Sequence, residues 1–283
     1  MTARRAAAGA VLFAALVAGS LADPLPRRAA VRSGEFQILA ADFHVHSFPG
    51  DGALTPRLLR DEAIRAGIDV IAVVNHNAFA APRLVSWLPD DPDAPLVIPG
   101  EEITHPDYHL IAVGIDRRIA PDGTVPEVAT RIHALGGVAI AAHPARMFAG
   151  YDQSALAAVD GTEVARADSR EQDRRDYVNV YERTRRTKPN LAAIGSSDMH
   201  TTLGLGDSRT YLFVRERSVA GVLEAVRSGR TVAINDRGEM FGDPDLVTII
   251  RRQAPAGRTD PHPWMRRMAA ALAWLGVAGL ALA

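Results

Sequence analysis

The sequence contains no cysteine among its 283 residues, which limits the chemistry that the protein can perform. Disulfide bonds, thiolate metal ligands and a cysteine nucleophile are all excluded. A transition metal would therefore have to be held by His, Asp and Glu. The Gly-x-Ser-x-Gly turn that exposes a serine nucleophile is also absent from the sequence.

An excess of charge of either sign is missing as well. The 32 basic and 33 acidic side chains leave a formal net charge of −1. Without a strong positive field the chain has no general attraction for phosphate backbones, so we expect a small-molecule substrate rather than nucleic acid. The apolar fraction of 47% and the charged fraction of 23% are those of an ordinary globular domain.

Long apolar runs are confined to the two ends of the chain. Residues 1–22 carry Arg4 and Arg5 before an uncharged apolar stretch, a pattern typical of a signal peptide or of a membrane anchor. Residues 264–283 form a second such run, which predicts a hydrophobic membrane tail, and the Pro-, Gly- and Arg-rich residues 251–263 predict a linker. We therefore expect a membrane-associated protein whose main domain is exported to the periplasmic or extracytoplasmic side.

Between these ends, short β-branched runs alternate with helical patterns. Helices are predicted at 55–66, 124–135 and 219–228, each of which is closely followed by glycine. The alternation predicts one α/β domain over residues 36–250, built on a parallel sheet or barrel. The runs that predict strands are 37–43, 69–74, 96–103, 110–113, 138–142, 161–164, 191–196 and 209–214.

The first of these strands ends in two histidines, His44 and His46. Side chains alternate between the two faces of a strand, so both imidazoles point to the same side. Asp51 follows between Gly50 and Gly52, and these glycines allow the loop to fold the carboxylate back over the strand end. Three metal-ligand side chains are thus expected close together.

Further ligand-type side chains stand at the ends or starts of later strands. The ends of parallel strands meet at one edge of a sheet or barrel, which is where active sites collect. Six of the nine histidines lie at such positions, whereas purely structural roles would scatter them. We therefore predict a metal site, and we expect solvated or structural roles for His105, His133 and His262. The additional candidates are His76, Glu101 or Glu102, His109, His143, Asp198 and His200.

These motifs, in this order, resemble the PHP (polymerase and histidinol phosphatase) superfamily over roughly residues 38 to 235. The resemblance implies a distorted seven-stranded (β/α) barrel that holds two or three divalent metal ions, usually manganese, zinc or iron. The residues that carry it are Asp42-Phe43-His44-Val45-His46, Asp51-Gly52, Asn75-His76, Gly100-Glu101-Glu102-Ile103-Thr104, His109, His143-Pro144 and Ser197-Asp198-Met199-His200.

The resemblance also implies how the ligands are shared among the metals. The first metal would be held by His44, His46, Glu102 and Asp198, the second by Glu102, His109 and His143, and the third by Asp51, His76 and His200. Glu102 directly precedes the Ile-Thr pair, as the family glutamate does, whereas Glu101 lies on the opposite face of the strand and is the alternative. Glu102, Asp198 and His200 are the expected catalytic residues.

A hydrolase that attacks its substrate with a metal-bound hydroxide is the expected enzyme. The superfamily's usual chemistry favours a phosphoester, either a small phosphorylated metabolite or a nucleotide, with Arg146 and Arg209 as candidate phosphate ligands. A carbamate, ester or amide substrate is the alternative, since the Gly-Glu-Glu-Ile-Thr stretch also resembles a carbamate-hydrolysing branch. An inactive membrane-tethered metal-binding protein is a third possibility. Glu163 is expected either to orient a ligand histidine or to form hydrogen bonds at the barrel mouth.

Overall fold

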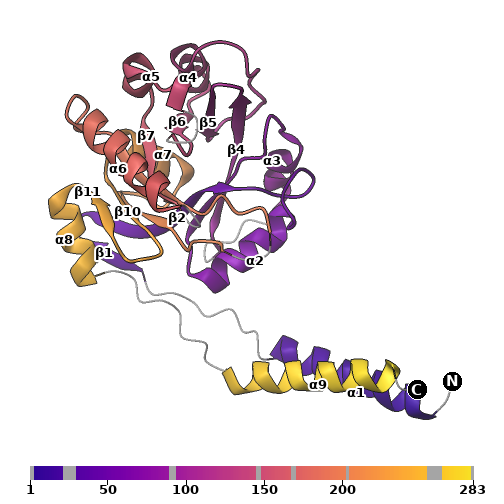
Figure 1. Ribbon diagram of the computed structural model, residues 1–283. Coiled ribbons are helices and arrows are strands. Elements are labelled where there is room, and N and C mark those ends of the chain that lie inside the picture. The colour runs from indigo at the N-terminus through magenta and orange to yellow at the C-terminus, as the bar shows by residue number, and fades with distance from the viewer. Residues whose placement is uncertain are drawn as a thin grey trace. The chain divides into compact units, whose positions relative to one another are not determined.

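The structure, a computed structural model, describes residues 3–21, 30–88, 94–144, 148–166, 170–201, 204–253 and 263–281. The chain divides into two compact units (Figure 1). The first consists of helices α1 (Ala3–Leu21) and α9 (Pro263–Ala281). The second contains the residues described between them.

Helices α1 and α9 pack against each other through small residues. Ala8 of α1 lies beside Gly279, and a Cβ atom added at Gly276 would lie only 2.5 Å from Cγ of Leu12. The two helices are therefore antiparallel, and their contact requires glycine at position 276.

Among the described residues, no helix is long and apolar enough to cross a membrane. The predicted signal or anchor segment at 1–22 and the predicted membrane tail at 264–283 are therefore not supported. The predicted linker at 251–263 begins inside helix α8 (Pro244–Gln253) and ends at the first residue of α9, and residues 254–262 lie outside the described residues.

The larger unit is built on one mixed sheet, which has eleven strands in the described residues (Figure 1). The strands follow the order β11-β10-β9-β2-β3-β4-β5-β6-β7-β8, with β1 paired to β2. Strand β8, at the end of this spatial order, also contacts β2, β9 and β10, so the sheet curls back on itself into a nearly closed barrel. Their bounds are β1 Val31–Ser33, β2 Phe36–Val45, β3 Val70–Val73, β4 Leu96–His105, β5 Tyr108–Val113, β6 Val138–Ala141, β7 Gly161–Arg166, β8 Ala192–Ser196, β9 Arg209–Val214, β10 Thr231–Ile234 and β11 Met240–Gly242.

Helices cover the outside of this sheet and begin at recognisable signals (Figure 1). Thr55 accepts a hydrogen bond from the Leu58 N–H at the start of α2, and Thr124 forms a capping box with Glu127 at the start of α4. The helices are α2 Pro56–Ala66, α3 Ala80–Leu84, α4 Val125–Ala134, α5 Gln153–Ala158, α6 Glu171–Arg185 and α7 Val219–Arg227, together with α8 and the 3₁₀ turns η1 Val85–Trp87 and η2 Phe148–Gly150.

The sheet differs from the expected parallel arrangement, because β1, β5, β9, β10 and β11 all pair antiparallel with a neighbour. Strands β2, β3 and β4 are parallel, as are β6, β7 and β8, but β5 is antiparallel to both of its neighbours. Only two residues separate β4 from β5, and so short a turn permits an antiparallel pair alone. Strand β9 also runs antiparallel to β2. The prediction of a barrel is therefore correct in outline, whereas those of a parallel sheet and of seven strands are wrong.

Candidate metal centre

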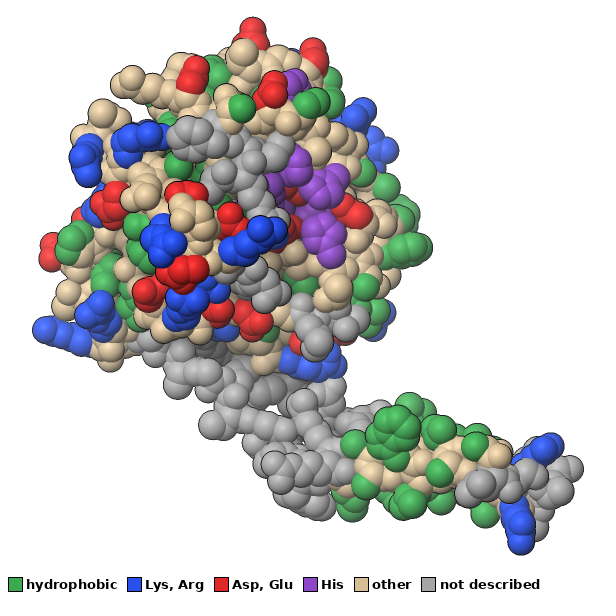
Figure 2. Space-filling view, in the orientation of Figure 1, with side chains coloured by type: hydrophobic (Ala, Val, Ile, Leu, Met, Phe, Trp, Pro, Cys, Tyr) green, Lys and Arg blue, Asp and Glu red, His purple; other side chains and the backbone are tan. Residues whose placement is uncertain are grey.

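Nine ligand-type side chains gather at one edge of the barrel, although they come from segments spread over more than 150 residues. Figure 2 shows several of the histidines together on the surface of this unit, with acidic side chains among them. The structure thus brings together every metal ligand predicted from the sequence, which are His44, His46, Asp51, His76, Glu102, His109, His143, Asp198 and His200.

Four of these side chains form the first group: His44, His46, Glu102 and Asp198. Nε2 of His44 lies 3.1 Å from Oε2 of Glu102 and 3.2 Å from Oδ1 of Asp198. Nε2 of His46 lies 3.3 Å and 3.2 Å from the same two oxygens. Two imidazole nitrogens and two carboxylate oxygens therefore converge on one small space.

The atoms that converge there fit a metal ion. Nε2 of both histidines, Oε2 of Glu102 and Oδ1 of Asp198 are buried and have no hydrogen-bond partner among the described residues. Buried polar atoms without partners each cost roughly 1–3 kcal/mol, so four of them aimed at one space call for a ligand. A divalent cation would satisfy all four at once, because nitrogen and carboxylate oxygen are ligands that manganese, zinc and iron accept.

Glu102 also belongs to a second group, together with His76 and His109. Its other oxygen, Oε1, lies 2.8 Å from Nδ1 of His109 and 3.1 Å from Nε2 of His143, so His143 adjoins this group. Oε2, which faces the first group, also lies 2.9 Å from Nδ1 of His76. A carboxylate with ligand atoms around both of its oxygens is suited to bridging two metal ions.

Glu101, the alternative to Glu102, points away from this edge. Its Oε2 accepts a hydrogen bond of 2.7 Å from the Ile119 N–H, and Arg118 lies 3.6 Å from Oε1. Burial raises the pKa of the Glu101 carboxyl to about 7 despite those two partners. Period-2 alternation along β4 thus separates two adjacent glutamates, and only Glu102 faces the candidate metal centre.

The third group consists of His46, Asp51, His76 and His200. Oδ1 of Asp51 lies 3.2 Å from Nδ1 of His46, and the rings of His46 and His200 are stacked with centroids 3.7 Å apart. The loop that carries Asp51 approaches β2 so closely that a Cβ at Gly52 would lie 2.1 Å from the His46 carbonyl carbon. The predicted return of this loop over the strand end therefore depends on glycine.

The electrostatics of the groups favour bound cations. Burial alone would raise the pKa values of Glu102 and Asp198, but His44 and the other neighbouring rings hold both well below their usual range. Burial disfavours the charged form of His46, yet the adjacent carboxylates of Asp198, Asp51 and Glu102 raise its pKa to about 10. Glu102 and Asp198 are therefore ionised at neutral pH, and a metal ion would replace the protons on the neighbouring histidines.

Backbone strain is concentrated at the same edge. Asn77, His143 and Asp198 are the non-glycine residues of the described chain with positive φ, at 45°, 28° and 55°. Each such residue costs on the order of 1–3 kcal/mol, and strain of this kind gathers at functional sites. Two of the three are candidate ligands, and the third follows His76.

Asp42, to which the sequence analysis assigned no role, joins the first ligand motif to the last. Its Oδ1 accepts hydrogen bonds from the N–H groups of His44 and Ser197, and Oδ2 accepts one from Gly206. Burial raises the pKa of Asp42 to about 6, although these donors oppose the rise. Its position two residues before His44, on the same face of β2, was the available signal.

Arg166 is a second residue that sequence reasoning missed. It ends β7, and its Nη2 contacts Oδ2 of Asp198. The Nε of Arg166 is buried and has no hydrogen-bond partner within the described part of the chain. Since the predicted strand stopped at residue 164, this side chain was not placed at the strand end.

Of the two arginines predicted as phosphate ligands, the structure describes only Arg209. Arg146 lies outside the described residues. Arg209 donates from Nε to the Gly206 carbonyl and from Nη1 to the Ala66 carbonyl, so part of its hydrogen-bonding capacity serves the backbone. Of the histidines expected to be structural, His133 lies 2.7 Å from Asp160 and His105 stacks on Tyr108, while His262 is outside the described residues.

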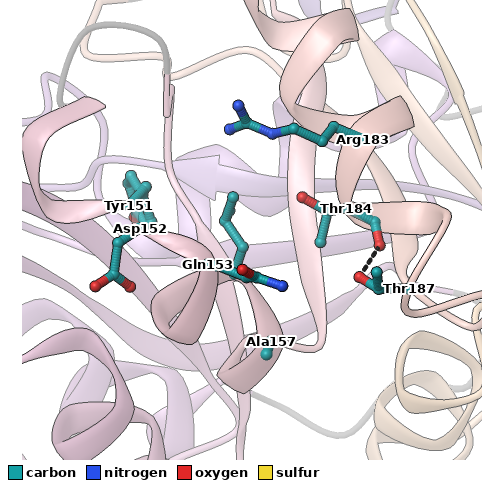
Figure 3. A pocket seen from close by; sticks show the side chains of 8 residues that line it. Tyr151, Asp152, Gln153, Ala157, Arg183, Thr184 and Thr187 are labelled. Carbon is teal, nitrogen blue, oxygen red and sulfur yellow. Dashed lines mark hydrogen bonds between the residues drawn. The ribbon is translucent and has the colours of Figure 1, made fainter.

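A separate cavity of about 410 Å³ lies between α5 and α6 (Figure 3). Its lining includes Tyr151, Gln153, Leu156 and Thr184, and it contains none of the candidate metal ligands. The Tyr151 hydroxyl donates a hydrogen bond to the backbone carbonyl of His109, so a residue of the cavity lining contacts the strand that carries this candidate ligand.

Two solved structures are similar to this fold. One is a two-domain protein from Bacteroides vulgatus that contains a predicted PHP-like metal-dependent phosphoesterase; it is 22% identical, has a TM-score of 0.62, and the match covers 81% of this chain and 74% of that one. The other, PsfC from Pseudomonas syringae, is 18% identical with a TM-score of 0.51, covering 76% and 97%. No protein-family model and no curated protein matches the sequence. The similarity shows that this chain shares the fold of these two structures.

Proposed function

We propose that this chain, which has the fold of PHP-like metal-dependent phosphoesterases, is a metal-dependent hydrolase that cleaves a phosphoester of a small metabolite or nucleotide. The observation that carries the proposal is the convergence of four buried, unpartnered ligand atoms from His44, His46, Glu102 and Asp198. A site of this composition suits a divalent cation, and one of the solved structures that resemble this chain contains a predicted PHP-like metal-dependent phosphoesterase.

The protein's own side chains would divide the work at this site. The three groups would hold two or three divalent ions, which supply a nucleophilic water at neutral pH and stabilise negative charge. Glu102 ties the first group to the second through its two oxygens. Burial and the neighbouring His46 lower the pKa of His200, so its ring is uncharged at neutral pH. A neutral imidazole can exchange a proton at the site.

The position of Arg166 favours a phosphoester over a carbamate or ester as the substrate. Its guanidinium lies beside Asp198, and its buried Nε lacks a partner. A planar cation next to a pair of metals suits the non-bridging oxygens of a phosphoester, which carry the full negative charge that a carbamate or ester lacks. The candidate ligand set itself is wholly polar.

The proposal is tested by metal analysis followed by a substrate panel. The purified full-length chain is loaded with Mn²⁺ or Zn²⁺ and assayed with phosphate monoesters, phosphate diesters, nucleotides, carboxylic esters and carbamates. We expect at least two metals per chain and turnover of a phosphoester, both of which the Glu102→Gln variant should lose. The Glu101→Gln variant is the matched control, because its side chain points away from the groups.

Two other outcomes would reject parts of the proposal. Cleavage of a carbamate or ester, with no phosphoester turned over, would reject the substrate class and leave a metal-dependent hydrolase. Fewer than two metals per chain, with no turnover and no effect of His44→Ala, would reject the enzyme altogether.

A further inference from the structure

Glu163 is a buried carboxylate that connects three ligand-bearing segments without facing the ligands' common space. It lies on β7 and is 0% exposed. Its Oε1 lies 2.8 Å from Nδ1 of His44, at the end of β2, and also accepts a hydrogen bond from the Ser196 hydroxyl at the end of β8. Its Oε2 accepts a 2.6 Å hydrogen bond from the backbone N–H of His143, just after β6.

The contact with His44 determines which ring nitrogen is available to a metal. A carboxylate can only accept, so Nδ1 of His44 must carry the proton that it donates to Glu163. The opposite nitrogen, Nε2, then presents its lone pair to the space shared with Glu102 and Asp198. Nε2 is the nitrogen that has no hydrogen-bond partner among the described residues.

The contact with His143 supports a strained backbone. The backbone of His143 has a φ of 28°, a value that residues other than glycine adopt only where the surrounding structure enforces it. The hydrogen bond from its N–H to Glu163 holds this conformation. The same conformation leaves Nε2 of His143 at 3.1 Å from Oε1 of Glu102.

Glu163 is unsuited to be a ligand itself. Both of its oxygens are engaged by donors, and it belongs to none of the three groups.

We propose that Glu163 is a positioning residue, which fixes the His44 tautomer and the His143 backbone and so prepares the first and second groups for metal, leaving the third group untouched. The inference rests on the proposed function, because it presumes that these groups bind metal. No contact in the described structure joins Glu163 to His46, Asp51, His76 or His200, so Glu163 can act on the third group only through His46 and His76, the ligands that this group shares with the other two.

The experiment measures metal binding without substrate. Full-length wild type and the Glu163→Gln variant are titrated with Mn²⁺ and Zn²⁺ against a competing chelator, and with Co²⁺, whose absorption spectrum reports ligand geometry. Glutamine keeps the shape of the side chain but places an NH₂ group opposite one of the donors that Glu163 accepts from, so that hydrogen bond is lost. We expect affinity at the first and second groups to fall by about 10- to 100-fold, as loss of such hydrogen bonds to ligands does, while one site keeps wild-type affinity.

Two further variants separate positioning from general stability. Glu101→Gln removes a buried carboxylate from the opposite face of β4 and should leave all affinities unchanged. Asp51→Asn should weaken the site that Glu163→Gln spares. The proposal is overturned if Glu163→Gln binds metal as wild type does, or if it weakens every site equally in step with a loss of folded protein.

The failure of this inference can be told from the failure of the proposed function. Wild type that binds no metal overturns both. Wild type that binds metal, together with an unaffected Glu163→Gln variant, overturns only the inference. Selective loss of metal in the variant supports the inference even if no phosphoester is cleaved.

Discussion

Arg166 and Asp198 form an ion pair at the candidate metal centre, and this pair divides the two oxygens of Asp198 between different tasks. Oδ2 contacts Nη2 of Arg166, whereas Oδ1 faces the Nε2 atoms of His44 and His46. A cation thereby holds the carboxylate in the orientation that points its other oxygen into the first group. Arg166 stays charged under all ordinary conditions.

Replacement of Arg166 by alanine should lower kcat/KM for a phosphoester by about 10- to 1,000-fold, because both a substrate cation and the support of Asp198 are lost. Arg166→Lys should recover only part of this, since an ammonium group cannot reproduce the planar fork. Steady-state kinetics with the best phosphoester measures the effect. Arg215→Ala is the control, because that arginine pairs with Glu35 and Glu224 away from the groups. Equal activity of Arg166→Ala and wild type would rule out both roles.

Bound metal should stabilise the folded protein. A ligand at 100 times its dissociation constant adds about 2.7 kcal/mol to the free energy of unfolding when it binds only the native state. We therefore expect Mn²⁺ or Zn²⁺ to raise Tm by several degrees in thermal unfolding, and EDTA to reverse the rise. The His44→Ala variant should show a smaller rise. A Tm that does not respond to metal in wild type would contradict the presence of native metal sites.

Gly52→Ala should impair the third group selectively. An added Cβ would overlap the His46 carbonyl at 2.1 Å, so the loop carrying Asp51 must move outward and take its carboxylate with it. We expect the metal held by His46, Asp51, His76 and His200 to bind at least about 10-fold more weakly, in titrations read by calorimetry. At Gly9 a Cβ meets no atom within 4 Å, and Gly9→Ala is the control. Unchanged stoichiometry and affinity in Gly52→Ala would refute the close approach.

Asp160 should make stability depend on pH in the acid range. Burial opposes its charged form, but the 2.7 Å contact with His133 and the 2.8 Å hydrogen bond from the Ala139 N–H lower its pKa below 3.8. A lowered carboxyl pKa stabilises the fold above the unfolded value, and this contribution disappears as pH falls through the folded value. Asp160→Asn should therefore cost about 1–3 kcal/mol at pH 7 and progressively less below about pH 4.

Urea unfolding of wild type and Asp160→Asn at several pH values measures this difference. Asp152 caps α5 at the surface, and Asp152→Asn should retain much of its cap and so provides a control. A cost that stays constant from pH 7 to pH 3 would show that the charge of Asp160 is not responsible.

The sequence predicted which side chains converge at the candidate metal centre more accurately than it predicted the sheet that carries them. Period-2 alternation places His44 and His46 on one face and separates Glu101 from Glu102, and both relationships are local properties of a strand. Glycines beside Asp51 indicated the returning loop. Each of these inferences required only a few adjacent residues.

The features that sequence reasoning missed depend on contacts between distant segments. β10 and β11 are short strands, and the pairing of β10 with β9 and of β11 with β10 is visible only in three dimensions. Whether Glu163 orients a ligand histidine or only forms hydrogen bonds at the barrel mouth depends on the position of His44, 119 residues away. The direction of β5 follows from a two-residue turn, whereas the resemblance to a (β/α) barrel favoured parallel strands.

The pairing of β2 with β9 has a consequence for the order in which the protein can mature. Gln37 lies opposite Val214 in the sheet, so the first long strand lacks one neighbour until almost the whole domain has left the ribosome. His44 and His46 are among the earliest ligands to be synthesised, and Asp198, which completes their group, is among the last. Such non-local closure is slow and leaves β2 with an exposed edge during synthesis. A metal ion bound by the first group would therefore be acquired late, after translation, and a stalled nascent chain would hold its histidines without the carboxylate of Asp198.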